Sequence, residues 1–360
     1  MVRGKVKYRA IFEELQKEIR NGRFPQGVPL PSEEALGRKH GVSRITVVRA
    51  MDELVRKGLV YRKRGAGTFA TRTACSESGR IGLIMPSLSF GEIFPPICQA
   101  LTRCAQQDGY SIVLGDISSP HPDRRAHEAC KIARAFVKQR VAGVLFQPLA
   151  FLKTPERVTC EILALFRDAG IPVVLLDRDV EHSVVPHDFV GIDNLGAGRA
   201  IGAHLLARKA KRVVFLSRPN CASVIRDRID GVASALSGSR ARFEAVSADP
   251  SDTARLAKLF RGRARPDAVV CESDYVAARL RNTRMRLKLS VPKDVMLAGF
   301  DDLMCAVTAT PPLTTAHQPC ADLASVAYRA LRERMRDPSL SSRKLLLPAP
   351  LVVRESTRKS

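Results

Sequence analysis

The sequence lacks the features that would assign the protein to a membrane, to the secretory pathway or to a zinc-binding class. No apolar run approaches the roughly 20 residues needed to cross a bilayer, and the N-terminus is charged within three residues, without an apolar signal segment. The nine cysteines are scattered, with no CxxC and no paired spacing of the kind that holds zinc. We therefore expect a cytoplasmic, reduced protein with no membrane partner, in which most cysteines are small buried apolar side chains.

Motifs of the common catalytic and nucleotide-binding classes are also missing. No G-x-G-x-x-G follows a predicted strand, and neither a P-loop nor a G-x-S-x-G nucleophile motif occurs. The seven histidines are isolated, with no cluster of metal ligands around them. The sequence therefore predicts no catalytic residue, no metal site and no cofactor, and it favours binding over catalysis.

Acidic residues are few relative to basic ones. The chain holds 59 Lys and Arg against 36 Asp and Glu, giving a net charge of +23. A surface this basic attracts polyanions through counterion release, although charge alone does not distinguish DNA from RNA or a membrane. Residues 1–72 hold 17 basic against 7 acidic residues, a net +10, which leaves +13 for a stretch four times as long. The basic density therefore peaks in this N-terminal module, which we call the head.

The head predicts three helices. Apolar residues recur at helical spacing over residues 8–19. Ser32 is placed to cap a short second helix that ends at Gly41, and Ser43 to cap a third that runs to about Lys57. Helix, tight turn and helix form the arrangement that sets a recognition helix in the major groove of DNA.

A β-hairpin is predicted after the third helix. Two short strands at 59–61 and 68–70 are joined by a segment in which Gly65 and Gly67 permit the positive φ angles of a tight turn. The same segment carries three consecutive cations, Arg62, Lys63 and Arg64. This hairpin is a candidate wing, unless the three cations are only a solvated hairpin tip.

These motifs together resemble the winged helix-turn-helix of GntR-family repressors over nearly all of residues 6–70. The segments that carry the resemblance are 30–33, 42–47, 58–60 and 62–69. By position, the resemblance implies that Arg44 reaches a guanine edge or a phosphate, Thr46 a phosphate and Gly67 the minor groove. The residues that we expect at DNA are Ser32, Ser43, Arg44, Thr46, Arg49, Arg62, Lys63, Arg64, Gly65 and Gly67.

The head departs from the family pattern at two positions. Glu34 and Val48 stand where family members often carry Arg. Arg49 can substitute for the second only if the helix is rotated slightly, and ordinary helix surface is the alternative for both Arg44 and Arg49. The base-reading code of the family therefore does not transfer.

From residue 80 onward, apolar runs alternate with amphipathic stretches. Strands are predicted at 81–85, 111–114, 143–146, 172–176, 213–216, 268–271 and 295–299. Helices are predicted at 93–108, 123–139, 155–168, 196–208, 226–236, 251–261 and 274–283. Short strands that alternate with helices build parallel sheets covered on both faces, and their number favours two doubly wound sheets.

Several stretches of this region resemble the effector domain of LacI/GalR-type regulators, itself similar to periplasmic sugar-binding proteins. In order, they are 80–85, 108–110, 141–144, 171–174, 193–198, 228–231, 291–302, 312–315 and 352–356. The resemblance implies a two-lobed, periplasmic-binding-protein-like α/β domain. It places the first lobe at about 80–178 and 305–337, and the second at about 179–304 and 338–356.

With its head, the chain resembles arabinose-repressor-like regulators, in which a GntR head is joined to a LacI/GalR body. We call residues 80–360 the body. The hinge-helix sequence of LacI-type proteins is absent, and a short polar linker at 73–79 takes its place.

In such bodies a ligand lies between the lobes, beyond the C-terminal ends of the strands. Arg228 offers a donor fork and Asp301 two acceptors, so we expect a ligand between them unless they form an interlobe ion pair. Asp177 matches another acidic pocket position, with a capping carboxylate as the alternative. Phe94 matches a position that packs on a sugar ring, with core packing equally favoured. Ser273 stands where many relatives carry Asn, so one hydroxyl contact is missing or made through water.

These patterns predict a homodimeric transcriptional repressor that binds double-stranded operator DNA and is released, or less often recruited, by a small sugar-like effector. A sugar- or nucleoside-processing enzyme with a basic head would need a nucleophile, paired carboxylates or a metal cluster, and none occurs at recognisable spacing. A periplasmic transport receptor would need a secretion signal and would leave the head unexplained. Turnover assays and cell fractionation, respectively, distinguish these alternatives.

Overall fold

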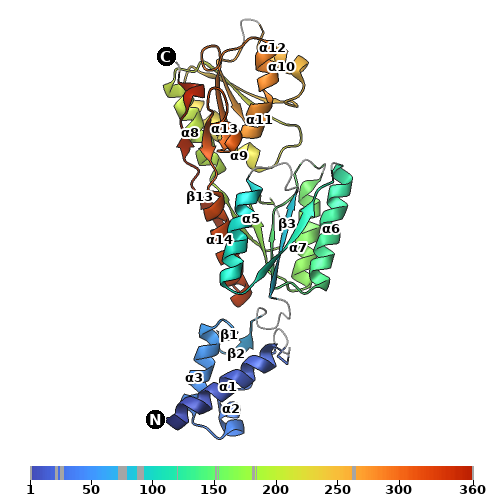
Figure 1. The fold of residues 1–360 in the computed structure, drawn as a ribbon, viewed down its shortest axis with the longest axis vertical. Helices are drawn as coiled ribbons and strands as arrows, with labels where there is room; N and C mark the ends of the chain where they lie inside the picture. The colour runs from blue at the N-terminus through green and yellow to red at the C-terminus, as the bar shows by residue number, and fades with distance from the viewer. Residues whose placement is uncertain are drawn as a thin grey trace.

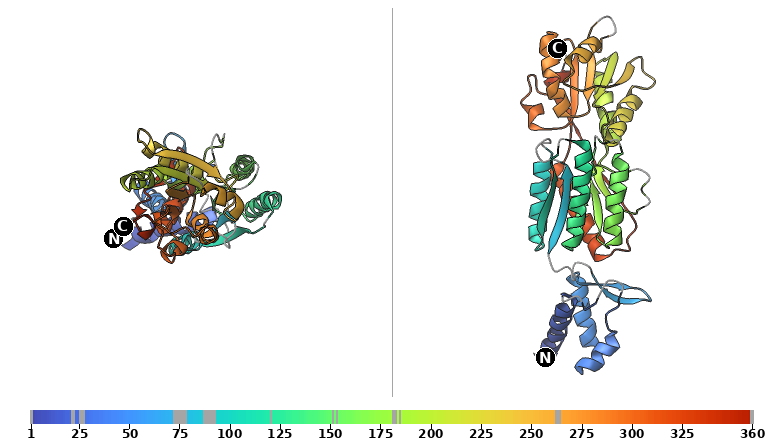
Figure 2. Two further views of the ribbon diagram at one scale, coloured as in Figure 1. Left: turned by 90° about the horizontal axis from the view of Figure 1, so that it is seen from above. Right: turned by 90° about the vertical axis from the view of Figure 1, so that its right-hand side faces the viewer.

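The computed structural model consists of three units stacked along one long axis, as Figures 1 and 2 show. The head lies at one end, a first α/β lobe in the middle and a second α/β lobe at the far end. The structure describes residues 2–20, 23–24, 28–71, 79–86, 93–119, 121–150, 152, 154–180, 183, 185–261 and 265–358. The expected linker at 73–79 lies outside these ranges except for Gly79. No helix within them is both long and apolar enough to cross a membrane.

The head contains the three helices and the hairpin that its sequence predicts. They are α1 (Val2–Arg20), α2 (Glu33–His40), α3 (Arg44–Arg56), β1 (Val60–Lys63) and β2 (Gly67–Ala70). Ser32 caps α2 as expected, because its hydroxyl accepts a hydrogen bond from the Ala35 amide at 3.1 Å, and Gly41 ends α2 in the left-handed conformation. Ser43 occupies the N-cap position of α3 but makes no capping bond to the backbone, which corrects that expectation.

One apolar core holds the head together and fixes the wing. Leu15, Leu36 and Leu54, one from each helix, are fully buried within it. The strands of the wing pair antiparallel, and the Leu30 amide donates to the Thr68 carbonyl at 2.7 Å. The segment that enters α2 is therefore tied to the wing, so that α2, α3 and the hairpin form one rigid surface.

The first lobe is a six-stranded sheet with helices on both faces. Its strand order is β13-β7-β6-β5-β3-β4, and every pairing is parallel. Helices α5 and α14 cover one face, and α6 and α7 cover the other (Figure 1). The elements are β3 (Arg80–Pro86), α5 (Phe94–Gln107), β4 (Ser111–Ile117), α6 (Pro122–Lys138), β5 (Gly143–Phe146), α7 (Pro155–Asp168), β6 (Val173–Leu176), β7 (Asp188–Ile192), α14 (Cys320–Arg336) and β13 (Lys344–Leu347).

The second lobe has the same architecture, with one antiparallel edge strand. Its order is β14-β12-β11-β10-β8-β9, in which only β14 runs antiparallel to its neighbour. Helices α8 and α9 cover one face, and α10, α11 and α13 cover the other. The elements are α8 (Asn194–Ala207), β8 (Arg212–Ser217), α9 (Val224–Leu236), β9 (Arg242–Ser247), α10 (Thr253–Leu259), β10 (Ala268–Cys271), α11 (Asp274–Arg279), α12 (Arg281–Arg286), β11 (Met296–Asp301), α13 (Met304–Val307), β12 (Thr314–His317), β14 (Leu351–Val352) and the 3-10 turn η1 (Glu355–Thr357).

The chain crosses between the lobes near residues 193, 318 and 348, because β7 and β13 belong to the first sheet and β12 and β14 to the second. The boundaries expected from the sequence, at about 178, 305 and 338, fall ten to fifteen residues too early. The reason is that β7, β12 and β13 were not among the predicted strands. None of them is an uninterrupted apolar run: β7 begins with Asp, β12 contains two threonines and β13 begins with Lys.

The cysteines differ from expectation in their burial. All eight described cysteines are free thiols, but only Cys271 is fully buried and the other seven are half-buried. Most of them lie at the margins of the apolar cores; Cys98 and Cys130, for example, pack against two different core clusters. A side chain at such a margin contacts the core on one side only.

Candidate functional site

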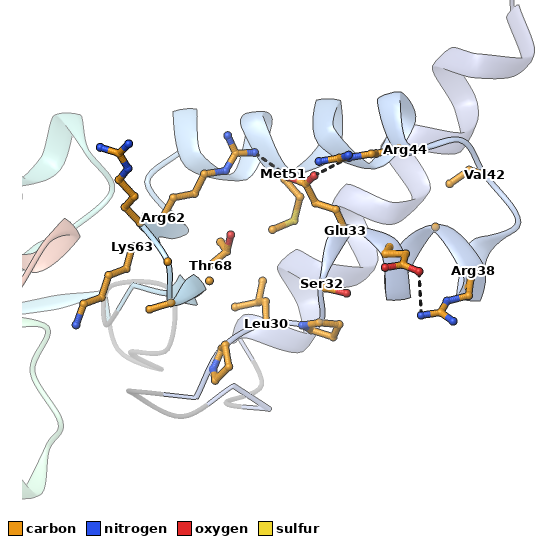
Figure 3. A pocket seen from close by; sticks show the side chains of 18 of the residues that line it. Leu30, Ser32, Glu33, Arg38, Val42, Arg44, Met51, Arg62, Lys63 and Thr68 are labelled. Carbon is orange, nitrogen blue, oxygen red and sulfur yellow. Dashed lines mark hydrogen bonds and ion pairs between the residues drawn. The ribbon is translucent and has the colours of Figure 1, made fainter.

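A hollow of about 1310 Å³ opens on the head between α2, the start of α3 and the wing (Figure 3). We call it the head hollow. It brings together seven of the ten residues predicted at DNA. They are Ser32, Arg44, Arg62, Lys63, Arg64, Gly65 and Gly67. A recognition helix that presents its first turn beside a basic wing is the arrangement expected of a module that reads one groove and holds the adjoining backbone.

Acidic side chains of the head contact the arginines of this hollow. Glu33, the first residue of α2, lies 3.5 Å from the Nε of Arg44 and 3.4 Å from a terminal nitrogen of Arg62 (Figure 3). Asp52 on α3 makes a second contact with Arg62 at 2.9 Å. Arg44 nevertheless remains 83% exposed. Because exposed ion pairs contribute little free energy, DNA phosphates can displace these carboxylates.

The wing tip forms one wall of the head hollow. Lys63 and Arg64 are exposed, and neither has an ion-pair partner within the described residues. Gly65 and Gly67 have φ angles of +76° and +115°, which a side chain would strain. The tip therefore carries two solvated cations on a backbone that needs glycine, and their contact with phosphate stays a prediction.

Three of the residues predicted at DNA lie outside the head hollow. The hydroxyls of Ser43 and Thr46 are 3.1 Å apart at the start of α3. The guanidinium of Arg49 lies 5.0 Å from the ring centre of Tyr8 on α1. Arg49 therefore lies on the side of the recognition helix that faces α1. It does not take the place that Val48 occupies on the helix.

In the body, Arg228 on α9 is held by contacts within the second lobe. Helices α8 and α9 approach so closely that a Cβ on Gly231 would lie 2.3 Å from the carbonyl oxygen of Leu195. From this position Arg228 donates its Nε to the Asn194 side chain and one terminal nitrogen to the Glu272 carbonyl, both at 2.7 Å. A buried guanidinium with this many partners is rigidly oriented.

Arg228 and Asp301 contact each other directly, with both terminal nitrogens 3.4 Å from one carboxylate oxygen. Both residues belong to the second lobe, so they form an ion pair within one lobe and not the interlobe pair that the sequence offered as the alternative. Ligand contact by either residue stays a prediction. Burial raises the pKa of the Asp301 carboxyl, which Arg228 opposes. The φ angle of Asp301 is +105°, a conformation that non-glycine residues adopt mainly at sites where function requires it.

The carboxylate of Asp177 binds two buried side-chain amides. It accepts hydrogen bonds from the side-chain nitrogens of Gln147 at 2.7 Å and Gln318 at 2.8 Å, so it does not serve as a helix cap. Gln318 lies at the crossing between β12 and α14, which links this cluster to the hinge of the body. The oxygens of both amides are buried without a hydrogen-bond partner in the described chain. They are free acceptors, suited to hydroxyl donors.

Comparison with known proteins agrees with this geometry. Residues 7–70 match the family model of bacterial regulatory proteins of the gntR family, and residues 203–357 match the periplasmic binding protein-like domain. The chain therefore joins a region similar to the gntR-family regulatory domain to a region similar to the periplasmic binding protein-like domain.

Relatives match most or nearly all of the chain. An arabinose metabolism transcriptional repressor from Halalkalibacterium halodurans is 28% identical over 98% of this chain and 96% of its own length. A ribose operon repressor from Bacillus subtilis is 25% identical over 90% of this chain and 92% of its own. A LacI-family regulator from Enterococcus faecium, solved with bound ribose, shares the fold with a TM-score of 0.63 at 18% identity, over 77% of this chain and 98% of that one.

Two predicted effector residues have structural roles in the periplasmic-binding-protein-like domain. Phe94 begins α5 and is 6% exposed within the apolar core, which agrees with the packing alternative. Ser273 caps α11, where its hydroxyl accepts a hydrogen bond from the Val276 amide at 3.3 Å. Ligand contact by either residue stays a prediction.

Asp274 is a buried acid beside this cluster that the sequence did not single out. Its two oxygens accept hydrogen bonds from the Thr315 hydroxyl at 2.8 Å and the Leu303 amide at 2.9 Å. Burial, and then the nearby charge of Asp301, raise its pKa to about 8. The residue is therefore largely neutral at pH 7.

Within the described residues, no group of three or more His, Cys, Asp and Glu could hold a metal ion.

Sequence reasoning missed Gln147, Arg178 and Gln318, all of which adjoin Asp177. Arg178 directly follows it in the chain, and its Nε lies 3.7 Å from an Asp177 oxygen. Gln147 follows β5 and Gln318 follows β12. A rule that marks the first polar residue after each parallel strand would have found Gln147, but Gln318 needed the prediction of β12.

Proposed function

We propose that this protein is a transcriptional regulator, acting as a repressor, whose operator binding is controlled by a small sugar-like effector held between the two lobes of the body. The observation that carries the proposal is the presence on one chain of a basic winged helix-turn-helix and a two-lobed domain with unsatisfied polar groups near its hinge. The relatives named as arabinose and ribose repressors support it. We further propose that it acts in the cytoplasm and catalyses no reaction.

The proposed form on DNA is a homodimer. One head of about 70 residues offers a single recognition helix and a single wing, too few contacts for specific binding. Two heads on half-sites one helical turn or a multiple apart bind with a much greater free energy, because the second head binds from a high effective concentration.

The proposed control rests on the hinge. Gln318, which binds Asp177, directly precedes the first residues of α14. At the other end of α14, the Nε of Arg336 lies 3.1 Å from where a Cβ on Gly58 of the head would be. A ligand that favours one arrangement of the lobes changes the position of α14. Through the contact at Arg336, this changes the orientation of the head.

The test is duplex binding by the full chain, measured by fluorescence anisotropy with an operator candidate, with and without sugars. We expect specific binding at moderate salt that at least one sugar or sugar derivative changes. Binding no stronger than to heparin contradicts the DNA half of the proposal. A ligand that binds the body and leaves DNA affinity unchanged contradicts the regulatory half.

A further inference from the structure

A second hollow, of about 420 Å³, lies between the two lobes on the side of Arg178. Its walls come from both lobes: Pro148 and Ala150 follow β5 in the first, and Ser217 and Ser247 end β8 and β9 in the second. We call it the interlobe hollow. Any ligand that fills it contacts both lobes at once.

Arginines dominate the charged lining of this hollow. Arg178 comes from the first lobe, and Arg218 and Arg226 come from the second. Arg125 on α6 lies beside them and donates to the carbonyl of Ala150, a lining residue, at 3.4 Å. Burial lowers the pKa of the Arg178 guanidinium, and the charges of Arg218, Arg125 and Arg228 lower it further against the opposing effect of Asp177.

Among the residues that the structure describes, the acids that line the interlobe hollow do not match this charge. They are Glu156, on the first turn of α7, and Asp179. Asp179 already contacts His187 at 3.0 Å and Lys344 at 3.4 Å. Buried Glu272 lies behind the lining and pairs with Arg218. Within the described residues, the charge of Arg178 is balanced by one carboxylate, that of Asp177.

Among the described residues, no carboxylate is hydrogen-bonded to Arg178. It donates to the Pro148 carbonyl at 3.2 Å, while its Nε is buried without a hydrogen-bond partner in the described chain. The nearest carboxylate, Asp177 at 3.7 Å, already accepts from two glutamine amides. Burying a guanidinium in this state is costly unless an acceptor completes the site.

We propose that the interlobe hollow binds a phosphate group, and that the effector is therefore a phosphorylated sugar. The inference rests on the proposed function and deepens it: the free amide oxygens beside Asp177 accept sugar hydroxyls, and the arginines of the adjoining hollow hold the phosphate. The planar fork of arginine fits phosphate oxygens, and the serine hydroxyls of the hollow add donors. Because the arginines come from both lobes, the phosphate favours their closed arrangement.

The test compares free sugars with their phosphates on the full-length protein. D-ribose, D-arabinose and D-glucose are each titrated by calorimetry against D-ribose 5-phosphate, D-arabinose 5-phosphate and D-glucose 6-phosphate, with operator affinity measured in parallel. We expect at least one phosphate to bind roughly tenfold or more tightly than its free sugar, as a charge-assisted contact provides. Inorganic phosphate should compete with that ligand.

Two matched variants test whether the arginines of the interlobe hollow bind the phosphate group. Arg226 is exposed, so Arg226→Gln removes one lining charge without leaving a buried cavity. Arg255→Gln removes the same charge from an exposed position on α10 of the same lobe, away from the hollow. We expect R226Q to weaken binding of the phosphorylated sugar several-fold and to leave the free sugar unaffected, while R255Q changes neither.

The outcomes separate this inference from the proposed function. A free sugar that binds as tightly as its phosphate and changes operator affinity overturns the phosphate site alone. Inorganic phosphate that binds without competing with any sugar phosphate also overturns it, since the anion site is then separate from the effector. If no compound of the panel binds or changes operator affinity, both proposals fail.

Discussion

The guanidinium groups of Arg44 and Arg62 meet at a single carboxylate, that of Glu33. Arg44 begins the recognition helix and Arg62 belongs to the wing, so Glu33 connects the two DNA-facing elements through their cations (Figure 3). A carboxylate in this position holds both arginines toward the head hollow. We expect it also to compete with phosphate, so that DNA binding exchanges these two ion pairs for phosphate contacts.

Replacing Glu33 by Gln should therefore increase the affinity for duplex DNA. Arg44 loses its internal partner, Arg62 keeps its contact with Asp52, and one negative charge leaves the binding surface. We therefore expect non-specific affinity at low salt to rise by about two- to fivefold, since exposed pairs are weak. Glu34→Gln is the control, because Arg38 is the ion-pair partner of Glu34 within the described residues. A fall in affinity for E33Q would mean that positioning of the arginines outweighs competition.

Arg44→Ala should weaken operator binding while effector binding stays intact. If Arg44 reads a base, the loss is about 1–3 kcal/mol, and the ratio of operator to random-duplex affinity falls with it. Arg157→Ala, an exposed arginine on α7 of the first lobe, serves as the control. Loss of both binding functions would indicate unfolding, and an equal loss on all sequences would assign Arg44 to a phosphate.

Arg228→Lys should give a protein that holds DNA and ignores effector. A lysine keeps the positive charge next to Asp301 but cannot also donate to Asn194 and the Glu272 carbonyl. We expect effector affinity to fall by roughly tenfold or more, as for a lost charged hydrogen bond. Unchanged effector affinity with a lowered unfolding temperature would instead make the pair purely structural.

Asp274 should make stability depend on pH between about 4 and 8. In the unfolded chain an aspartate ionises near 3.8, while in the folded protein the pKa of Asp274 is about 8. Between these values the folded state keeps a proton that the unfolded state has lost. The contribution of Asp274 to stability is therefore full below about pH 4 and is progressively lost as the pH rises to about 8.

The variant Asp274→Asn tests this dependence. Asn cannot ionise, so the stability of D274N relative to the unmodified protein should rise with pH across this window. Urea unfolding of both proteins at pH 5 and pH 8 measures it. A stability difference that is the same at both pH values would rule out a raised pKa at this position.

The sequence predicted the head more accurately than the body. Cap residues, helix breakers and glycine turns are local signals, and they placed α2, α3 and both strands of the head within two residues. The apolar spacing at 8–19 marked α1 but began it six residues late. In the body, the predicted strands were those with continuous apolar runs. Strand β7 begins with Asp, β12 contains two threonines, and β13 is an edge strand with alternating exposure. The omission of these three strands moved the lobe boundaries.

The sequence also predicted the candidate DNA-binding site of the head better than the candidate effector site of the body. The sequence by itself determined the cationic wing and the recognition helix, because those residues are close in the chain and their roles follow from local geometry. Only the tertiary structure decided that Arg228 and Asp301 pair within one lobe, that Gln318 donates to Asp177, and that arginines from both lobes share one hollow. These contacts join residues up to 141 positions apart, and sequence periodicity carries no information about which distant loops a parallel sheet brings to the same edge.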